Sequence, residues 1–322
     1  MIRYCRPNID PEISLTGIEQ ILYNGWVSNG AWCENLERYF KKNCNVKYAF
    51  TCSNATTGLI MAVKAAGWEN MNINIPAFTW PSTKYAVECN GGNYEYVDIN
   101  KKSWVSEINI SDVDAYYDNK KYILVDTFGY QTELDSLHNP DNVIIDAAHG
   151  FDLPGLGHRG LAEVVSFSHT KLVTGGEGGI ILTNDDILAS KLHLMRRMYG
   201  RMSEINAYIA IKSIFRYNRN KPKLEKIIDK YINELNFPFK TQSRGFTNNS
   251  VFAITFENKE KRDKAVKAME DNDIEVKVYY EPLVKGLPNT DYVFDRILAL
   301  PVYVEMIDKQ DFIITTLNRS QE

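Results

Sequence analysis

Short apolar runs alternate with amphipathic stretches along the first two-thirds of the chain. Apolar residues at helical spacing predict helices at about 10–24, 34–42, 55–66 and 82–89. Compact apolar runs between them predict strands at 46–50, 73–75, 94–97, 122–125, 143–145, 164–167 and 179–183. Strands that alternate with helices in this way predict an α/β fold with a largely parallel sheet.

The pattern changes after about residue 206. A long, charged helical stretch runs through Lys221 and Lys230 and resembles a linker helix. Beyond it the pattern predicts a strand at 251–256, a helix at 259–271, a strand at 275–279 and a last helix from Asp308. We therefore expect a large domain over residues 1–205, followed by the linker helix and a smaller α+β domain over 206–322.

Composition narrows the class of protein. The chain has 322 residues, 44% hydrophobic and 24% charged, which is ordinary for a globular protein. Its formal net charge of -4 offers no global attraction for a phosphate backbone, so no nucleic acid partner is expected. We find neither a signal-like apolar run at the start nor a stretch of about 18 apolar residues, and we expect a cytoplasmic protein that does not span a membrane.

The cysteines and histidines do not suggest a metal site. There are five of each, and they are scattered without a C-x-x-C pair or closely spaced ligands. We expect free thiols and no bound metal.

The first candidate for chemistry is the segment 166–179. Lys171 follows a predicted strand, and Gly175, Gly176, Gly178 and Gly179 come soon after it. Glycines let a planar cofactor approach the backbone closely. The alternative is a solvated surface lysine followed by an ordinary turn.

A second candidate follows the apolar run Val143–Ile145. Pyridoxal-5'-phosphate (PLP) chemistry needs an ionised carboxylate against the pyridine nitrogen, and Asp146 suits that role. The alternative is that Asp146 only caps a following helix. Because ligands of open α/β sheets gather beyond the carboxyl ends of the strands, we expect Asn54, Asp146 and Lys171 to meet there.

Together these segments resemble the DegT/DnrJ/EryC1/StrS family of PLP-dependent aminotransferases, over about residues 6–301. The segments that carry the resemblance keep the family order: Arg6-Pro7, 25–30, 53–59, 76–83, Phe128-Gly129 with Asp135, 146–149, Ser166-Phe167 with Lys171, and 176–179. The resemblance implies an aspartate-aminotransferase-like fold, fold type I, with a mostly parallel mixed sheet and a smaller C-terminal domain.

The resemblance also implies roles for single residues. Lys171 would hold PLP as a Schiff base and later move a proton, and Asp146 would face the pyridine nitrogen. Ala55 and Thr56, at a helix start, and Ser166 would bind the cofactor phosphate. Trp80 would lie on the pyridine ring, unless it is an ordinary core tryptophan. His149 stands where the family usually has glutamine and would contact the ring hydroxyl.

Some positions depart from the family pattern. The loop Met198–Gly200 is short, and Tyr199 stands where the family has an asparagine that reaches the neighbouring subunit's cofactor phosphate. Tyr279 replaces a histidine of the C-terminal motif. The basic run Lys212, Arg216, Arg219, Lys221 and Lys223 either faces a substrate diphosphate or forms a solvated helix face.

The resemblance predicts an aminotransferase that converts a keto sugar to an amino sugar, with L-glutamate as donor. The substrate would be nucleotide-linked, such as an NDP-4-keto- or 3-keto-6-deoxyhexose, in amino sugar and cell-surface polysaccharide biosynthesis. A cyclic ketone without a nucleotide and a non-catalytic PLP-binding regulatory protein are the alternatives. We expect a homodimer, from the resemblance and from exposed apolar residues near Trp26 and Trp32.

Overall fold

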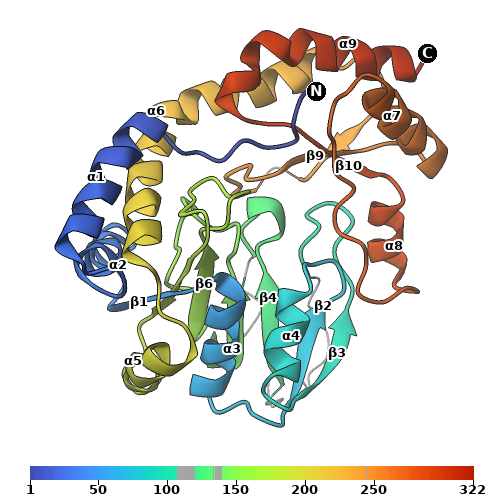
Figure 1. Ribbon diagram of the computed structural model, residues 1–322. Coiled ribbons are helices and arrows are strands. Elements are labelled where there is room, and N and C mark those ends of the chain that lie inside the picture. The colour runs from blue at the N-terminus through green and yellow to red at the C-terminus, as the bar shows by residue number, and fades with distance from the viewer. Residues whose placement is uncertain (107–119, 133, 135–139, 244) are drawn as a thin grey trace.

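Two β-sheets organise the chain (Figure 1). The computed structural model describes residues 1–106, 120–132, 134, 140–243 and 245–322, so Asp135 of the family motif lies outside the described residues. Within the described part, a seven-stranded sheet has the order β1-β7-β6-β5-β4-β2-β3, and a three-stranded sheet has the order β10-β9-β8.

The large sheet is mixed and mostly parallel. Its strands are β1 Tyr48–Cys52, β2 Asn72–Pro76, β3 Asn93–Val97, β4 Lys121–Val125, β5 Val143–Asp146, β6 Ala162–Ser166 and β7 Gly179–Thr183. The pairs from β6 to β3 are parallel, whereas β7 is antiparallel to both β6 and β1. β1 therefore runs parallel to β6, and the carboxyl ends of six strands share one edge.

Helices cover both faces of this sheet. The helices are α1 Pro11–Asn24, α2 Ala31–Asn43, α3 Ala55–Ala65, α4 Ser82–Glu88, α5 Asp186–Tyr199, α6 Glu204–Glu234, α7 Lys259–Asp271, α8 Pro288–Phe294 and α9 Gln310–Ser320, with 3₁₀ turns η2 Thr127–Gly129, η3 Pro140–Asn142 and η4 Val304–Lys309. Val143 and Ile145 of β5 pack in one core with α2 and α6, and Ile144 packs in another with α3, α4 and α5. Strands buried on both faces read as continuous apolar runs, which is why the sequence predicted them well.

Helix α6 joins the two sheets. Its first half packs Ala207 and Ile214 against the large sheet, and its second half packs Ile227 and Tyr231 into the core of the small sheet. Figure 1 shows α6 running from the large sheet to the end of the molecule that holds α7 and α9. The small sheet consists of β8 Lys240–Thr241, β9 Phe252–Thr255 and β10 Ile297–Leu300.

A buried carboxylate fixes the start of α6 to the start of α2. Glu204 is 2% exposed and accepts hydrogen bonds from the backbone N–H groups of Gly30, Trp32 and Cys33, at 2.8, 2.8 and 2.9 Å. The N-cap residue of α2 is Gly30, which has no side chain to satisfy these donors. Glu204 therefore caps α2 from a distant part of the chain.

The predicted strand at 275–279 is wrong. This segment makes one isolated bridge, between Lys277 and Ala299 of β10. At its start, backbone pairing goes to the N-terminus: the N–H of Ile2 donates to the carbonyl of Asp273 at 2.6 Å, and the N–H of Glu275 donates to the carbonyl of Ile2 at 2.8 Å. The division at residues 205 and 206 falls at the first turn of α6, and its status as a domain boundary stays a prediction.

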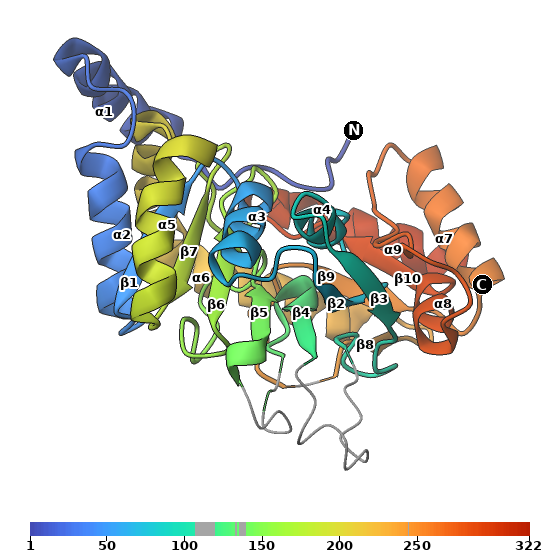
Figure 2. The ribbon, with the colours of Figure 1, turned by 90° about the horizontal axis from the view of Figure 1, so that it is seen from below.

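The surface near the first helix is only partly as expected. Helix α1 packs against α6 and projects from the body of the molecule (Figure 2). Leu15, Tyr23 and Trp26 are 67%, 84% and 67% exposed. The prediction of exposure is wrong for Trp32, which is half-buried and packs edge-on against Tyr208, with ring centroids 4.7 Å apart.

Candidate active site

A cavity of about 610 Å³ opens at the carboxyl edge of the large sheet. Asn54 follows β1, Asp146 ends β5 and Lys171 follows β6, and all three line the cavity, as the sequence predicted. Ser250 and Tyr280, from the chain around the small sheet, line it too. The site therefore lies between the two sheets.

Lys171 lies in a tight turn after β6. Its backbone N–H donates to the carbonyl of Ser168 at 3.1 Å, and its Nζ lies 2.7 Å from Nε2 of His149. Burial lowers the pKa of the Lys171 amine to about 8, although the negative charge of Asp146 opposes this change. Because the amine is held by His149 within the cavity, Lys171 is not a solvated surface lysine. Its lowered pKa lets the amine lose a proton near neutral pH.

Asp146 is a buried carboxylate, 4% exposed. Thr83 donates its hydroxyl to Oδ2 at 2.8 Å, and the backbone N–H of Ala148 donates to Oδ1 at 3.1 Å. Burial raises the pKa of Asp146, and both hydrogen bonds act against that rise. A turn, and no helix, follows Asp146, so its proposed role as a helix cap is wrong.

His149 is the centre of a hydrogen-bond network that the sequence did not reveal. Its Nε2 lies 3.0 Å from the hydroxyl of Tyr280, in addition to Lys171, and its Nδ1 lies 2.8 Å from Oγ of Ser250. Burial, and then the positive charge of Lys171, lowers the pKa of the His149 ring well below its usual range. The ring is therefore neutral, and one of its nitrogens must be an acceptor.

The start of α3 forms one end of the cavity. Asn54 caps the helix by accepting from the N–H of Thr57 at 2.8 Å, and the N–H groups of Ala55 and Thr56 have no acceptor among the described residues. A Cβ on Gly179 would come within 2.9 Å of the backbone at Asn54 and Ala55, so this glycine lets β7 pass close to the helix start. Two free N–H groups at a helix N-terminus favour an anion.

Ser166 and Trp80 also line the cavity. Ser166 ends β6 and is 7% exposed, and its Oγ accepts from the N–H of Ser168 at 3.3 Å. Trp80 is 59% exposed, and its ring lies 6.5 Å from that of Tyr280. Trp80 is therefore not an ordinary core tryptophan, and its ring borders the cavity.

The departures from the family pattern lie near this site. Tyr279, in place of histidine, lines the cavity and packs edge-on against Tyr4, with centroids 5.7 Å apart. The predicted loop at Met198–Gly200 is wrong, because Met198 and Tyr199 form the end of α5 and only Gly200 follows the helix. Gly200 packs beside the start of α3, where its carbonyl accepts from the N–H of Ser53 at 3.2 Å. Tyr199 is 45% exposed.

The basic run on α6 is a paired helix face. Arg216 pairs with Glu305 at 2.5 Å, and Lys221 pairs with Asp152 at 2.7 Å. Arg219 lies 3.8 Å from Asp10. These charges are satisfied within the chain, and none of the five basic residues lines the cavity. The solvated-face interpretation is therefore the better one.

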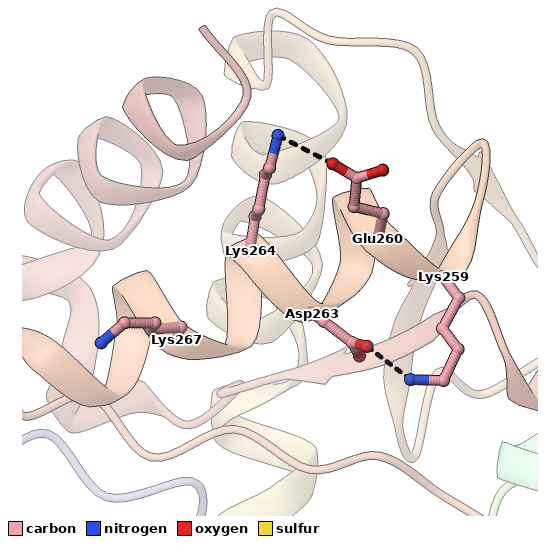
Figure 3. A pocket seen from close by; sticks show the side chains of 5 residues that line it. All are labelled: Lys259, Glu260, Asp263, Lys264 and Lys267. Atoms are coloured by element: carbon pink, nitrogen blue, oxygen red, sulfur yellow. Dashed lines mark hydrogen bonds and ion pairs between the residues drawn. The ribbon is translucent and has the colours of Figure 1, made fainter.

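A second hollow lies on the outer face of α7 (Figure 3). Its charged side chains pair one turn apart, Lys259 with Asp263 and Lys264 with Glu260, at 2.5 and 3.2 Å. Such exposed pairs are ordinary for a solvated helix. We assign this hollow no function.

The described residues contain no group of three or more His, Cys, Asp or Glu side chains placed to hold a metal ion, and their five cysteines are free thiols. No helix in the same part of the chain is long and apolar enough to cross a membrane.

Comparison with known proteins identifies the class. The model of the DegT/DnrJ/EryC1/StrS aminotransferase family matches residues 8–318, and the chain belongs to this family. The family, the aspartate-aminotransferase-like fold, the enzyme class and the PLP cofactor predicted from the sequence are thereby confirmed.

Solved structures with low sequence identity share the fold. DesI, crystallised in the presence of its TDP-sugar product, is 22% identical, with a TM-score of 0.85 over 98% of this chain and 93% of that chain. NtdA from Bacillus subtilis, with bound PMP, is 21% identical, with a TM-score of 0.87 over 98% and 83%. The sugar aminotransferase CalS13 from Micromonospora echinospora is 19% identical, with a TM-score of 0.87 over 99% and 100%.

The residues of the cavity fit PLP. The carboxylate of Asp146 is buried and has no ion-pair partner among the described residues, so it can oppose a ring N–H. The free N–H groups of Ala55 and Thr56 suit a phosphate, and the amine of Lys171 suits an aldehyde. An anion site, a buried carboxylate and an amine of lowered pKa thus border one cavity.

Proposed function

We propose that this enzyme transfers an amino group from L-glutamate to the keto carbon of a nucleotide-linked sugar. The observation that carries the proposal is the meeting of Lys171 and Asp146 in one cavity with the free start of α3. DesI, which shares the fold, was crystallised with a TDP-sugar product, and this supports a nucleotide-linked acceptor.

Lys171 would form the covalent bond to the cofactor and would transfer the proton. When bound, PLP supplies an electrophilic carbonyl carbon and an electron-withdrawing ring. Nζ of Lys171 would hold the cofactor, and as a free amine it would move a proton at the α-carbon of the amino donor. Because its pKa is about 8, the amine can serve both as a base and as an acid near neutral pH.

The other residues of the cavity would position the cofactor, and Asp146 would also polarise its ring. Asp146 would hold a positive charge on the ring nitrogen, and that charge would in turn lower the raised pKa of the carboxylate. Ala55, Thr56 and Ser166 would bind the phosphate. Trp80, exposed at the cavity, would stack on the ring, and an aromatic face there would exclude water.

His149 would contact the ring hydroxyl. The ring of His149 already faces the amine of Lys171, which favours a contact near the reacting carbon. The substrate would lie against the remaining wall, where Tyr4 and Tyr279 line the cavity together with Lys277. Aromatic faces and a cation are suited to a sugar that carries phosphate.

We further propose a homodimer whose contact includes the exposed apolar face of α1 around Leu15, Tyr23 and Trp26. A role in cell-surface polysaccharide synthesis and a cytoplasmic location remain predictions from the sequence.

The test is a screen of donors and acceptors on purified protein loaded with PLP. Keto sugars with and without a nucleotide, and cyclic ketones, are each offered with glutamate, and the aminated product is followed by mass spectrometry. We expect turnover with a nucleotide-linked keto sugar, none with Lys171→Ala, and visible cofactor absorbance that Lys171→Ala loses. Turnover only of ketones without a nucleotide would refute the substrate, and a protein that binds PLP but aminates nothing would refute catalysis.

A further inference from the structure

The network around His149 extends the proposed function. We propose that the hydroxyls of Ser250 and Tyr280 are positioning groups, which hold His149 so that its Nε2 accepts from Nζ of Lys171 and directs this amine into the cavity. Ser250 precedes β9 of the small sheet and Tyr280 follows the segment 275–279, whereas His149 follows β5 of the large sheet. The small-sheet side of the molecule thus sets the alignment of the reactive amine.

The hydrogen-bond inventory fixes the tautomer. A lysine ammonium can only donate, so Nε2 of His149, 2.7 Å from Nζ, must accept from it. The ring is neutral, and its proton is therefore on Nδ1, from where it donates to Oγ of Ser250 at 2.8 Å. Without Ser250 this buried N–H would lose its acceptor.

The backbone around Ser250 shows that this contact is built into the fold. Nδ2 of Asn248 donates to the carbonyls of His149 and Phe151, both at 2.6 Å. Oδ1 of Asn248 accepts from the N–H of Ser250 at 2.8 Å. The segment 248–250 therefore holds both the backbone and the ring of His149.

Aromatic packing holds Tyr280, the second hydroxyl partner of His149, in place. The ring of Phe128 stacks on that of Tyr280, with centroids 5.2 Å apart and planes at 29°, and meets the ring of His149 edge-on at 6.4 Å. Tyr280 is buried, and its hydroxyl lies 3.0 Å from Nε2. Phe128 thus packs against the rings of both Tyr280 and His149 and keeps the His149 ring next to Lys171.

A neutral imidazole suits this position for a physical reason. A carboxylate at the same distance would hold Lys171 as an ammonium, and an apolar side chain would leave its direction unset. His149 is hydrogen-bonded to the amine, and the charge of Asp146 acts on it. The other titratable side chains that line the cavity are Tyr4, Cys5, His169, Glu177, Glu275, Lys277, Tyr279 and Tyr280. An uncharged acceptor aims the amine without adding negative charge to this set.

A double-mutant cycle in the cofactor-free enzyme tests the proposal. Ser250→Ala and Tyr280→Phe are made in the natural background and in His149→Ala, with His149→Leu as a second background should His149→Ala not fold. Ser190→Ala and Tyr85→Phe, on exposed helix faces, are the matched controls. The readout is the pH dependence of acetylation of Lys171, measured by peptide mass spectrometry, together with PLP affinity from absorbance.

We expect Ser250→Ala to lower the pH midpoint of Lys171 acetylation, because the buried N–H of His149 loses its acceptor. Tyr280→Phe should raise that midpoint, because the Tyr280 hydroxyl donates to the same Nε2 lone pair as the amine and its loss leaves the lone pair to Lys171. Both variants should weaken PLP binding about threefold to tenfold, the range for one lost hydrogen bond. In the background lacking His149 both effects should vanish, because the hydroxyls act through the ring. Effects that persist there in full, or no effect in the natural background, would overturn the proposal. This readout needs no substrate, so it stays informative if the proposed transamination fails.

Discussion

Replacing Lys171 by methionine should stabilise the cofactor-free enzyme. The amine has a pKa of about 8 in the fold, against 10.5 for an exposed lysine. Since one pKa unit corresponds to about 1.4 kcal/mol, keeping this amine charged costs the folded state about 3.5 kcal/mol at most. Methionine has a similar shape and no charge, and His149 keeps the hydroxyl of Tyr280 as a partner.

The pH dependence gives the sign of the effect. Between pH 8 and 10.5 the unfolded chain binds a proton at Lys171 that the folded chain has lost, so the stability of the natural protein rises with pH across this window. Below pH 8 the amine is charged in both states and the full cost is present. The advantage of Lys171→Met should therefore be largest below pH 8 and fade towards pH 10.5.

Urea unfolding of both proteins, freed of cofactor, at pH 7, 8, 9 and 10 measures this difference. Subtracting the two curves cancels the tyrosines and other lysines that titrate in the same range. Lys212→Met, on a partly exposed helix position outside the cavity, is the matched control. A variant less stable than the natural protein at pH 7, or a difference constant with pH, would contradict a buried amine of lowered pKa.

Four further predictions concern other parts of the molecule. Asp146→Ala should retain the visible absorbance of bound PLP yet lose most turnover, because the ring nitrogen loses its anion; near-normal steady-state rates would show that the carboxylate is only structural. Glu204→Ala should lower the free energy of unfolding by about 3 kcal/mol, because three buried N–H groups lose their acceptor, and an unchanged urea midpoint would contradict this. Sedimentation should show a dimer, and Tyr199→Phe should change the Kd for PLP less than twofold; a fully active monomer would refute the first claim and a large change in affinity the second.

The sequence predicted the large sheet well because most of its strands, the edge strand β3 excepted, are buried on both faces. Apolar runs such as Val143–Ile145 and 179–183 leave little ambiguity between buried and exposed positions. The segment 275–279 was misread because a cavity wall and a half-buried strand produce the same alternation: Glu275, Lys277 and Tyr279 line the cavity, and the residues between them pack in the small-sheet core.

The sequence also predicted that Lys171 and Asp146 meet in the candidate site. It did not predict the side chains that hydrogen-bond to Asp146 and His149 there. Lys171 and Asp146 follow strands of one parallel sheet, so topology alone brings them together. The hydrogen-bond partners come from distant parts of the chain. Thr83 bonds to Asp146 across 63 residues of sequence, and Ser250 and Tyr280 bond to His149 across 101 and 131 residues. The motif position next to Tyr279 could have suggested Tyr280, whereas nothing near Ser250 indicated a contact with a histidine ring.

The departures from the family pattern fall into two neighbourhoods, and this bears on how they can be reversed. Tyr199 lies near the start of α3, where the N–H of Ser53 donates to the carbonyl of Gly200. The other two departures, His149 and Tyr279, both contact Tyr280. Nε2 of His149 lies 3.0 Å from the hydroxyl of Tyr280, and the ring centroids of Tyr279 and Tyr280 are 5.3 Å apart. These two replacements share Tyr280 as a neighbour. Changing His149 to glutamine alone therefore leaves the hydroxyl of Tyr280 in a position that suits an imidazole ring. Lys171 and Asp146 match the family pattern and line the same cavity.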